Sequence, residues 1–215
     1  MKNVPLTLSI ALAFVLWTLM FSPWTSSFIP FWPTMCVSAL ILSTLAFLFT
    51  ERTPREPKPD KRVPILRLWM ENILIGIAIA AVLWGVFWLG DKVSQWMFPS
   101  FARTQVNSIY GMKTDINPWL LSCLLLFLIG PAEELFWRGY VQKALTKRWN
   151  IWGAVLAIAL YALVHLFSLN FMLIMAALVC GVVWGGLFYL FPRRFPALVI
   201  SHALWDAAVF VWFPI

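Results

Sequence analysis

Two adjacent carboxylates, Glu133 and Glu134, lie with Arg138 inside an otherwise apolar stretch of the sequence. An ionisable residue at the centre of a bilayer helix costs about 2.5–3.5 kcal/mol on insertion scales. Such residues therefore need partners and usually serve a function. Later apolar stretches hold three candidate partners: His165, His202 and Asp206. We interpret all six groups as one buried catalytic site.

Helical phase separates the residues of the first cluster. Glu134 and Arg138 are four residues apart, so they share one helix face and can pair. Glu133 lies about 100° round the helix from Glu134 and faces other helices. Tyr161 precedes His165 by one turn on the same face. We therefore predict a supporting role for Glu134, Arg138 and Tyr161.

The depth of each group in its span can be compared by counting from the nearest basic turn. Glu133 lies fifteen residues before Arg148 and His165 lies seventeen after it. In an antiparallel hairpin both reach roughly 22–26 Å from the turn. His202 follows Arg194 by only eight residues, which is roughly 12 Å. Helix tilt, or a fourth span that extends into the cytoplasm, has to close this gap.

A carboxylate and a neutral imidazole around one water form a general base. A second imidazole can donate to a developing oxyanion, so the set predicts amide hydrolysis without a covalent intermediate. No Ser or Cys is evidently paired with either histidine, since Ser201 points about 100° away from His202 on a helix. Two histidines with a carboxylate also suit zinc or iron. A metal-dependent protease stays an alternative, although HExxH is absent.

The composition indicates an all-α polytopic membrane protein. Of the 215 residues 62% are hydrophobic and 12% are charged, whereas charged residues make up about 25% of a soluble domain. The apolar runs are continuous, unlike the alternating strands of a membrane barrel. Three cysteines in apolar runs are not a disulfide framework. The fourteen tryptophans suit belts at the membrane interfaces.

Seven apolar runs predict seven spans. They are Leu6–Phe21, Phe28–Phe49, Leu68–Leu89, Pro118–Ala144, Ile151–Phe167, Phe171–Phe191 and Pro196–Phe213. We predict a membrane region with three spans at 1–117 and a catalytic core of four spans at 118–215. The linker Glu51–Arg67 is basic and proline-rich, which predicts a solvated loop. The segment Asp91–Asn117 is either an interfacial piece or an ordinary loop.

The basic residues are distributed unevenly between the two sides of these spans. With a cytoplasmic N-terminus, twelve of the sixteen Lys and Arg residues fall on the cytoplasmic side and three on the opposite side. The positive-inside rule therefore predicts that the N-terminus is cytoplasmic and the C-terminus is outside. The net charge of +7 is explained by topology, so we expect no nucleic-acid partner.

Three motifs in the second half of the chain carry a family resemblance. They are, in chain order, Glu133-Glu134-x-x-x-Arg138, Tyr161-x-x-x-His165 and His202-x-x-x-Asp206. Together they resemble the CPBP intramembrane proteases, the family of the type II CAAX prenyl protease and of bacteriocin-processing and bacteriocin-immunity proteins. The second motif has tyrosine where the family has phenylalanine. The resemblance covers about residues 118–210.

The resemblance implies a role for each of these residues. Glu133 would activate the attacking water together with His165, and His202 with Asp206 would stabilise the oxyanion. An asparagine can donate to an oxyanion, whereas an ionised aspartate repels it. Asp206 must therefore be protonated, or must act by orienting His202.

The resulting hypothesis is a glutamate-dependent intramembrane endopeptidase without a cofactor. Its partners would be the bilayer and a membrane-delivered peptide or protein, and its location a prokaryotic inner or plasma membrane. One rival is a non-catalytic immunity or scaffold protein that keeps the polar cluster for packing. Another is a transporter with a proton relay, but the sequence lacks an evident repeat.

Overall fold

The protein is a bundle of helices. A computed structural model describes residues 4–50, 64–113 and 116–215, and these contain helices and turns but no strand. Seven helices within them are long and apolar enough to cross a membrane. The prediction of an all-α polytopic membrane protein is confirmed.

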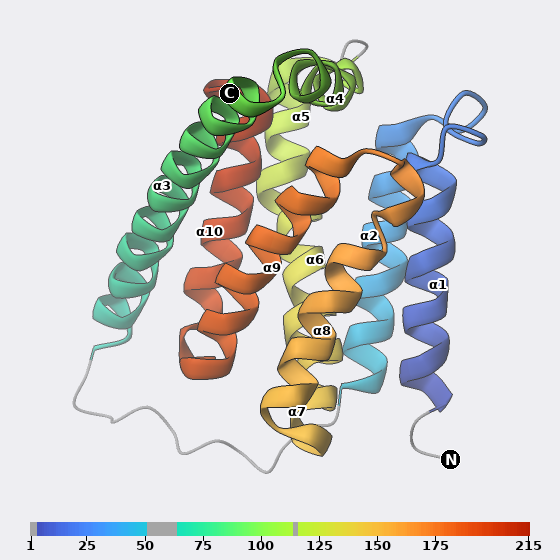
Figure 1. Ribbon diagram of the computed structural model, residues 1–215. Coiled ribbons are helices and arrows are strands. Elements are labelled where there is room, and N and C mark those ends of the chain that lie inside the picture. The colour runs from blue at the N-terminus through green and yellow to red at the C-terminus, as the bar shows by residue number, and fades with distance from the viewer. Residues whose placement is uncertain (1–3, 51–63, 114–115) are drawn as a thin grey trace.

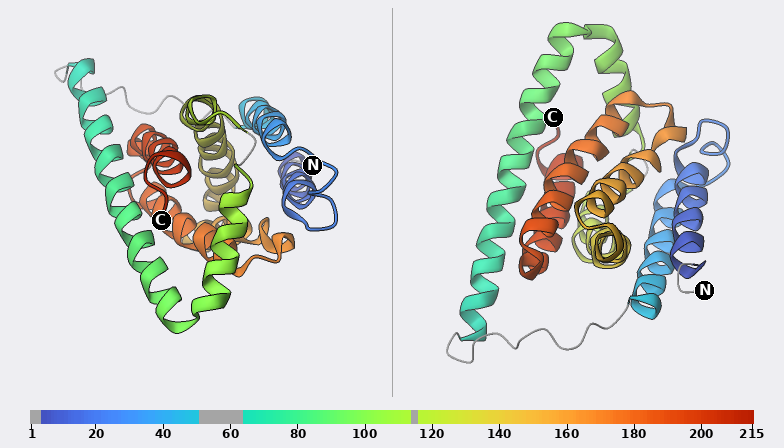
Figure 2. Two further views of the ribbon diagram at one scale, coloured as in Figure 1. Left: turned by 90° about the horizontal axis from the view of Figure 1, so that it is seen from above. Right: turned by 60° about the horizontal axis from the view of Figure 1, so that its bottom comes forward.

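The first half of the chain forms a helical hairpin and a long helix that ends in a bend. Helices α1 (Val4–Phe21) and α2 (Phe31–Phe49) pack side by side. Helix α3 (Ile65–Met97) runs along the opposite side of the bundle (Figure 1). Helix α4 (Pro99–Gly111) turns across the end of the bundle where the C-terminus lies, as both views in Figure 2 show.

Helix α3 is longer than the sequence indicated. The predicted span ended at Leu89 because Asp91 and Lys92 are charged, but the helix continues to Met97. Proline cannot continue a helix, and the next proline is Pro99, which begins α4. The prediction that Asp91 belongs to a loop or an interfacial piece is therefore wrong. Most of the predicted linker, residues 51–63, lies outside the described residues.

The fourth span contains two π-helical segments, one before and one after the short α-helix that carries the two carboxylates. Its segments are α5 (Pro118–Leu124), η1 (Leu125–Ile129), α6 (Gly130–Glu134), η2 (Leu135–Gln142) and α7 (Lys143–Trp149). Segments η1 and η2 are π-helical, and the N–H of Gly130 bonds the carbonyl of Leu125, five residues back. Pro131 has no N–H to continue an α-helical ladder. π-Helical turns are rare and often mark functional sites.

The remaining spans complete the bundle. They are α8 (Ile151–Leu163) with η3 (Leu166–Ser168), then α9 (Phe171–Leu190), and finally η4 (Pro192–Arg194), α10 (Phe195–Ala207) and the π-helical η5 (Ala208–Trp212). Helix α10 packs against both α3 and α6. A Cβ atom on Gly130 would lie 2.8 Å from the Cα of Ala203. Glycine at this position therefore lets α6 and α10 approach closely.

The depth difference predicted for His202 is resolved by unequal span lengths. The fourth span continues to Trp149 through α7, which extends beyond the start of α10 in Figure 1. Fewer residues of α10 are therefore needed to reach the level of Glu134.

Candidate active site

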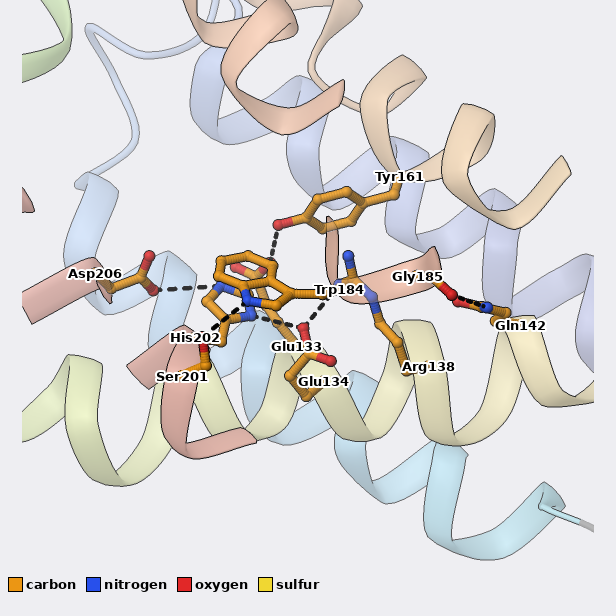
Figure 3. Close-up of polar contacts among 10 residues, drawn as sticks. All are labelled: Glu133, Glu134, Arg138, Gln142, Tyr161, Trp184, Gly185, Ser201, His202 and Asp206. Atoms are coloured by element: carbon orange, nitrogen blue, oxygen red, sulfur yellow. Dashed lines mark hydrogen bonds and ion pairs between the residues drawn. The ribbon is translucent and has the colours of Figure 1, made fainter. Parts of the chain in front are cut away.

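Glu134 is the centre of a buried polar network between the fourth and seventh spans. Its Oε1 atom lies 2.9 Å from Nη1 of Arg138 and 2.8 Å from Nδ1 of His202 (Figure 3). Glu134 is fully buried, and the other two residues are 2% exposed. A carboxylate paired with arginine only accepts hydrogen bonds, so the His202 Nδ1–H donates to it. The pairing predicted for Glu134 and Arg138 is present in the structure.

The ring of His202 is held in one orientation by its neighbours. It stacks on Trp184, with 3.9 Å between ring centroids and 18° between the ring planes. Its Nε2 atom lies 3.5 Å from Oδ2 of Asp206, one turn further along α10 (Figure 3). Ser201 accepts a hydrogen bond from Nε1 of Trp184 at 3.1 Å. Ser201 is therefore part of the packing around the ring.

Glu133 differs from Glu134 in its surroundings. It is partly exposed, and its Oε2 atom accepts one long hydrogen bond, 3.4 Å, from the hydroxyl of Tyr161 (Figure 3). Among the described residues no ion pair holds Glu133. Tyr161 in turn lies against Arg138, with 4.3 Å between the guanidinium carbon and the ring centroid. Glu133 is thus the more available of the two carboxylates.

His165 lies at the end of α8 with both ring nitrogens engaged. Nδ1 is 3.1 Å from the carbonyl oxygen of Tyr161, and Nε2 accepts a hydrogen bond from Nε1 of Trp17 at 3.2 Å. An indole N–H only donates and a carbonyl only accepts. The proton of neutral His165 must therefore be on Nδ1. Trp17 fixes this tautomer from α1, a helix that no sequence pattern connects with the site.

Replacing Trp17 with phenylalanine tests this connection. The ring remains but the donor is lost, so Nε2 of His165 is released and the tautomer is no longer fixed. We expect the free energy of unfolding to fall by about 1 kcal/mol. The chain has only two histidines, so histidine labelled with ¹⁵N gives two imidazole signals. We expect one of them to change from the Nδ1–H form to a mixture.

Trp24→Phe is the matched control, because Trp24 is 67% exposed and does not contact His165. It should leave both imidazole signals where they are. An unchanged His165 signal in Trp17→Phe would contradict the assignment of the tautomer to Trp17.

A cavity of about 450 Å³ joins the candidate residues. Its lining includes Glu133, Tyr161, His165, His202 and Asp206, with side chains from α1, α2, α3, α4 and α9. Volumes of about 300–1,000 Å³ are usual for ligand pockets. The structure therefore places the four predicted catalytic residues, Glu133, His165, His202 and Asp206, around one cavity. Glu134 and Arg138 are not among the residues that line it.

The metal alternative can be compared with the ligands that the site offers. In the described part of the chain, no group of three or more His, Cys, Asp or Glu side chains could hold a metal ion. Both nitrogens of His165 have partners, and Nδ1 of His202 bonds Glu134. A metal bound by His165 would have to displace one of its two contacts, whereas Nε2 of His202 has only Asp206 beside it.

Several neighbours of the site were missed from the sequence. Trp17, Trp137 and Trp184 are fully buried, so the assignment of the tryptophans to interfacial belts is wrong for these three. A tryptophan in an apolar helix has no sequence signal for burial. Asp91 lines the cavity and is 7% exposed. A charged residue that adjoins a long apolar stretch is a sequence signal of the same kind as that of Glu133, and Asp91 carries it.

Adjacent carboxylates, an arginine and two histidines around a cavity between membrane-spanning helices define the class as an intramembrane peptidase. Comparison with family models supports this class. Residues 115–208 match the model described as "Type II CAAX prenyl endopeptidase Rce1-like", so the resemblance read from the three motifs is confirmed for this segment. No curated protein matches the chain. No solved structure matches it.

Proposed function

We propose that this protein is a glutamate-dependent endopeptidase that hydrolyses a peptide bond inside the membrane. In this proposal Glu133 takes a proton from a water molecule, and the water oxygen bonds to the carbonyl carbon of the substrate. The C–N bond then breaks, and Glu133 returns the proton to the leaving nitrogen. One observation carries the proposal: Glu133 lines the cavity with a single long hydrogen bond, whereas Glu134 is fully buried and paired.

His202 and Asp206 suit the stabilisation of the oxyanion in this reaction. Glu134 fixes Nδ1 of His202, which directs Nε2 toward Asp206. The separation of 3.5 Å between Nε2 and Oδ2 is long for a hydrogen bond. A carbonyl oxygen beside both atoms finds a donor in Nε2 when His202 is doubly protonated, because the Nδ1–H already donates to Glu134. Asp206 donates to the same oxygen when it is protonated and orients the ring when it is ionised.

His165 takes part only after a rearrangement. Its single lone pair, on Nε2, accepts from Trp17, so water or substrate must displace the indole before His165 can bind it. The indole and His165 both line the cavity. We propose that entry of the substrate peptide releases Nε2, which then positions the attacking water beside Glu133.

The proposed setting is the plasma membrane of a prokaryote, with a cytoplasmic N-terminus. The uneven distribution of Lys and Arg supports this orientation. Seven apolar helices make the protein an integral membrane protein. With the N-terminus inside, α4 lies on the outer side of the membrane. The proposed substrate is a peptide or protein delivered through the bilayer.

The test is cleavage by the purified full-length protein in detergent, with and without a chelator. A synthetic peptide library randomised at single positions serves as the substrate, and mass spectrometry identifies the products. We expect cleavage to continue at an unchanged rate in the presence of EDTA or phenanthroline, because the proposed base and oxyanion donors are side chains. Loss of cleavage with a chelator and recovery with zinc would establish the metal-dependent alternative instead.

A further inference from the structure

Asp91 is a buried carboxylate that the proposed reaction does not use. It lies in α3 and is 7% exposed. Its Oδ2 atom accepts a hydrogen bond from Nε2 of Gln95 at 2.5 Å, and Nζ of Lys92 lies 3.9 Å away. Its buried Oδ1 atom has no hydrogen-bond partner in the described part of the chain. A buried polar atom without a partner is costly, so this carboxylate has capacity for a donor.

The position of Asp91 relates it to the candidate active site. It follows Phe87 by one helical turn, and the Phe87 ring packs against that of Trp205 with 4.7 Å between centroids. Trp205 precedes Asp206 in α10. The four residues from Phe87 to Asp91 correspond to about 6 Å along α3, in the direction of α4. Asp91 and Glu133 line the same cavity.

The cavity lining contains three acidic residues, and its basic side chains are the imidazoles of His165 and His202. Its lining includes Asp91, Glu133 and Asp206, and within the described ranges it includes neither Lys nor Arg. Lys92 has 56% of its side chain exposed. Lys113 donates from Nζ to the carbonyl oxygen of Phe210 at 2.7 Å. The direct cationic partner of Asp91 is thus the largely exposed Lys92, and Arg103 reaches it only through Gln95, whose Oε1 accepts from Nη2 of Arg103 at 2.6 Å.

Tyr110 is close enough to Asp91 for the carboxylate to act on its phenol. Burial raises the pKa of the Tyr110 phenol, the hydrogen bond from the backbone N–H of Ile215 lowers it, and the negative charge of Asp91 raises it. Tyr110 lines the cavity from α4.

We propose that Asp91 binds a positively charged side chain, lysine or arginine, of the substrate peptide close to the bond that Glu133 attacks. This inference rests on the proposed function. Asp91 and Glu133 line the same cavity, and an extended peptide advances about 3.3–3.6 Å per residue, so the basic residue lies within a few positions of that bond. The apolar side chains that line the cavity lower the local dielectric constant, which strengthens the charge pair.

The test is a comparison of cleavage preferences in the peptide library described above. We expect the wild-type protein to prefer Lys or Arg at one position within a few residues of the cleaved bond. Asp91→Asn keeps the shape of the side chain and removes its charge, so this preference should fall by about 10- to 100-fold. Asp91→Lys should shift the preference at that position toward Asp or Glu.

Glu71→Gln is the matched control, because Glu71 lies at the other end of the same helix. It pairs with Arg194 at 3.1 Å and is not among the residues that line the cavity. The Glu71→Gln variant should prefer Lys or Arg at the same position and to the same degree as the wild type. Thermal unfolding in detergent shows whether each variant is folded.

The outcomes separate the two proposals. A wild-type protein that cleaves without preferring a basic residue, or an Asp91→Asn variant that keeps the preference, overturns the inference about Asp91 alone. A folded wild-type protein that cleaves no peptide overturns the proposed function and this inference with it. Cleavage that depends on Glu133 with a preference that depends on Asp91 establishes both.

Discussion

Replacing Glu133 with glutamine lowers the rate of peptide cleavage by at least about 1,000-fold, because an amide cannot take a proton from water. The variant should fold normally. Glu133 makes one hydrogen bond of 3.4 Å and no ion pair among the described residues, and glutamine has the same shape. The measurement is the cleavage rate on the peptide library, with thermal unfolding in detergent recorded for the same sample.

Glu71→Gln is again the control, since it removes a carboxylate from outside the cavity and should keep the wild-type rate. A Glu133→Gln protein that cleaves as fast as the wild type would end the assignment of Glu133 as the base. Glu134, the other carboxylate of the pair, would then be the candidate base.

Replacing Arg138 with methionine destabilises the folded protein by about 3–5 kcal/mol, because Glu134 is then a buried charge without its cation. Arg138 also loses its contacts with the rings of Tyr161 and Trp184, 4.3 Å and 5.6 Å from the guanidinium carbon. The apparent melting temperature in detergent should fall by about 10 °C. Glu134→Gln in the same chain should recover part of this loss by removing the unpaired charge.

Arg67→Met provides the contrast, because Arg67 also pairs with a glutamate four residues away. Its Nε lies 3.3 Å from Oε1 of Glu71, but its side chain is 72% exposed. Exposed pairs contribute about 0–1 kcal/mol, so the melting temperature should hardly change. Equal shifts for the two arginine variants would show that burial does not decide the value of the Arg138 pair.

Much of the fold follows from the sequence because one physical property determines it. Backbone polar groups must be satisfied inside the bilayer, so seven apolar runs become seven helices. Proline and charged residues are less reliable predictors of where these helices end. Pro99 stops α3, whereas Asp91 and Lys92 do not, since charged side chains near a membrane surface are compatible with a helix.

The predicted residues of the site come from three spans, the fourth, fifth and seventh, and their positions follow partly from helical phase. The pairing of Glu134 with Arg138 and the separate direction of Glu133 follow from a period of 3.6 residues. The π-helical segments on both sides of α6 cannot be predicted in this way. A backbone hydrogen bond to the carbonyl five residues back leaves no signal in the pattern of apolar side chains. The contact between His202 and Glu134 depends on the length of α7, which hydropathy cannot measure.

Contacts between distant helices are the part that the sequence does not reveal. Trp17 and His165 are 148 residues apart, and nothing in either local pattern relates them. The same holds for the stacking of Trp184 on His202. Such pairs depend on how the helices pack. Periodicity shows on which face of its helix a residue lies, but not which helix that face contacts.

The hydrogen bond from Trp17 to His165 bears on which part of the chain is a working unit. Trp17 lies outside the segment 115–208 that matches the family. The cavity wall that carries Asp91 lies outside it as well. The matched segment therefore does not supply every side chain that builds the site. The helices that precede it contribute one wall of the cavity and the tautomer of His165, so residues 115–208 alone would be an incomplete peptidase.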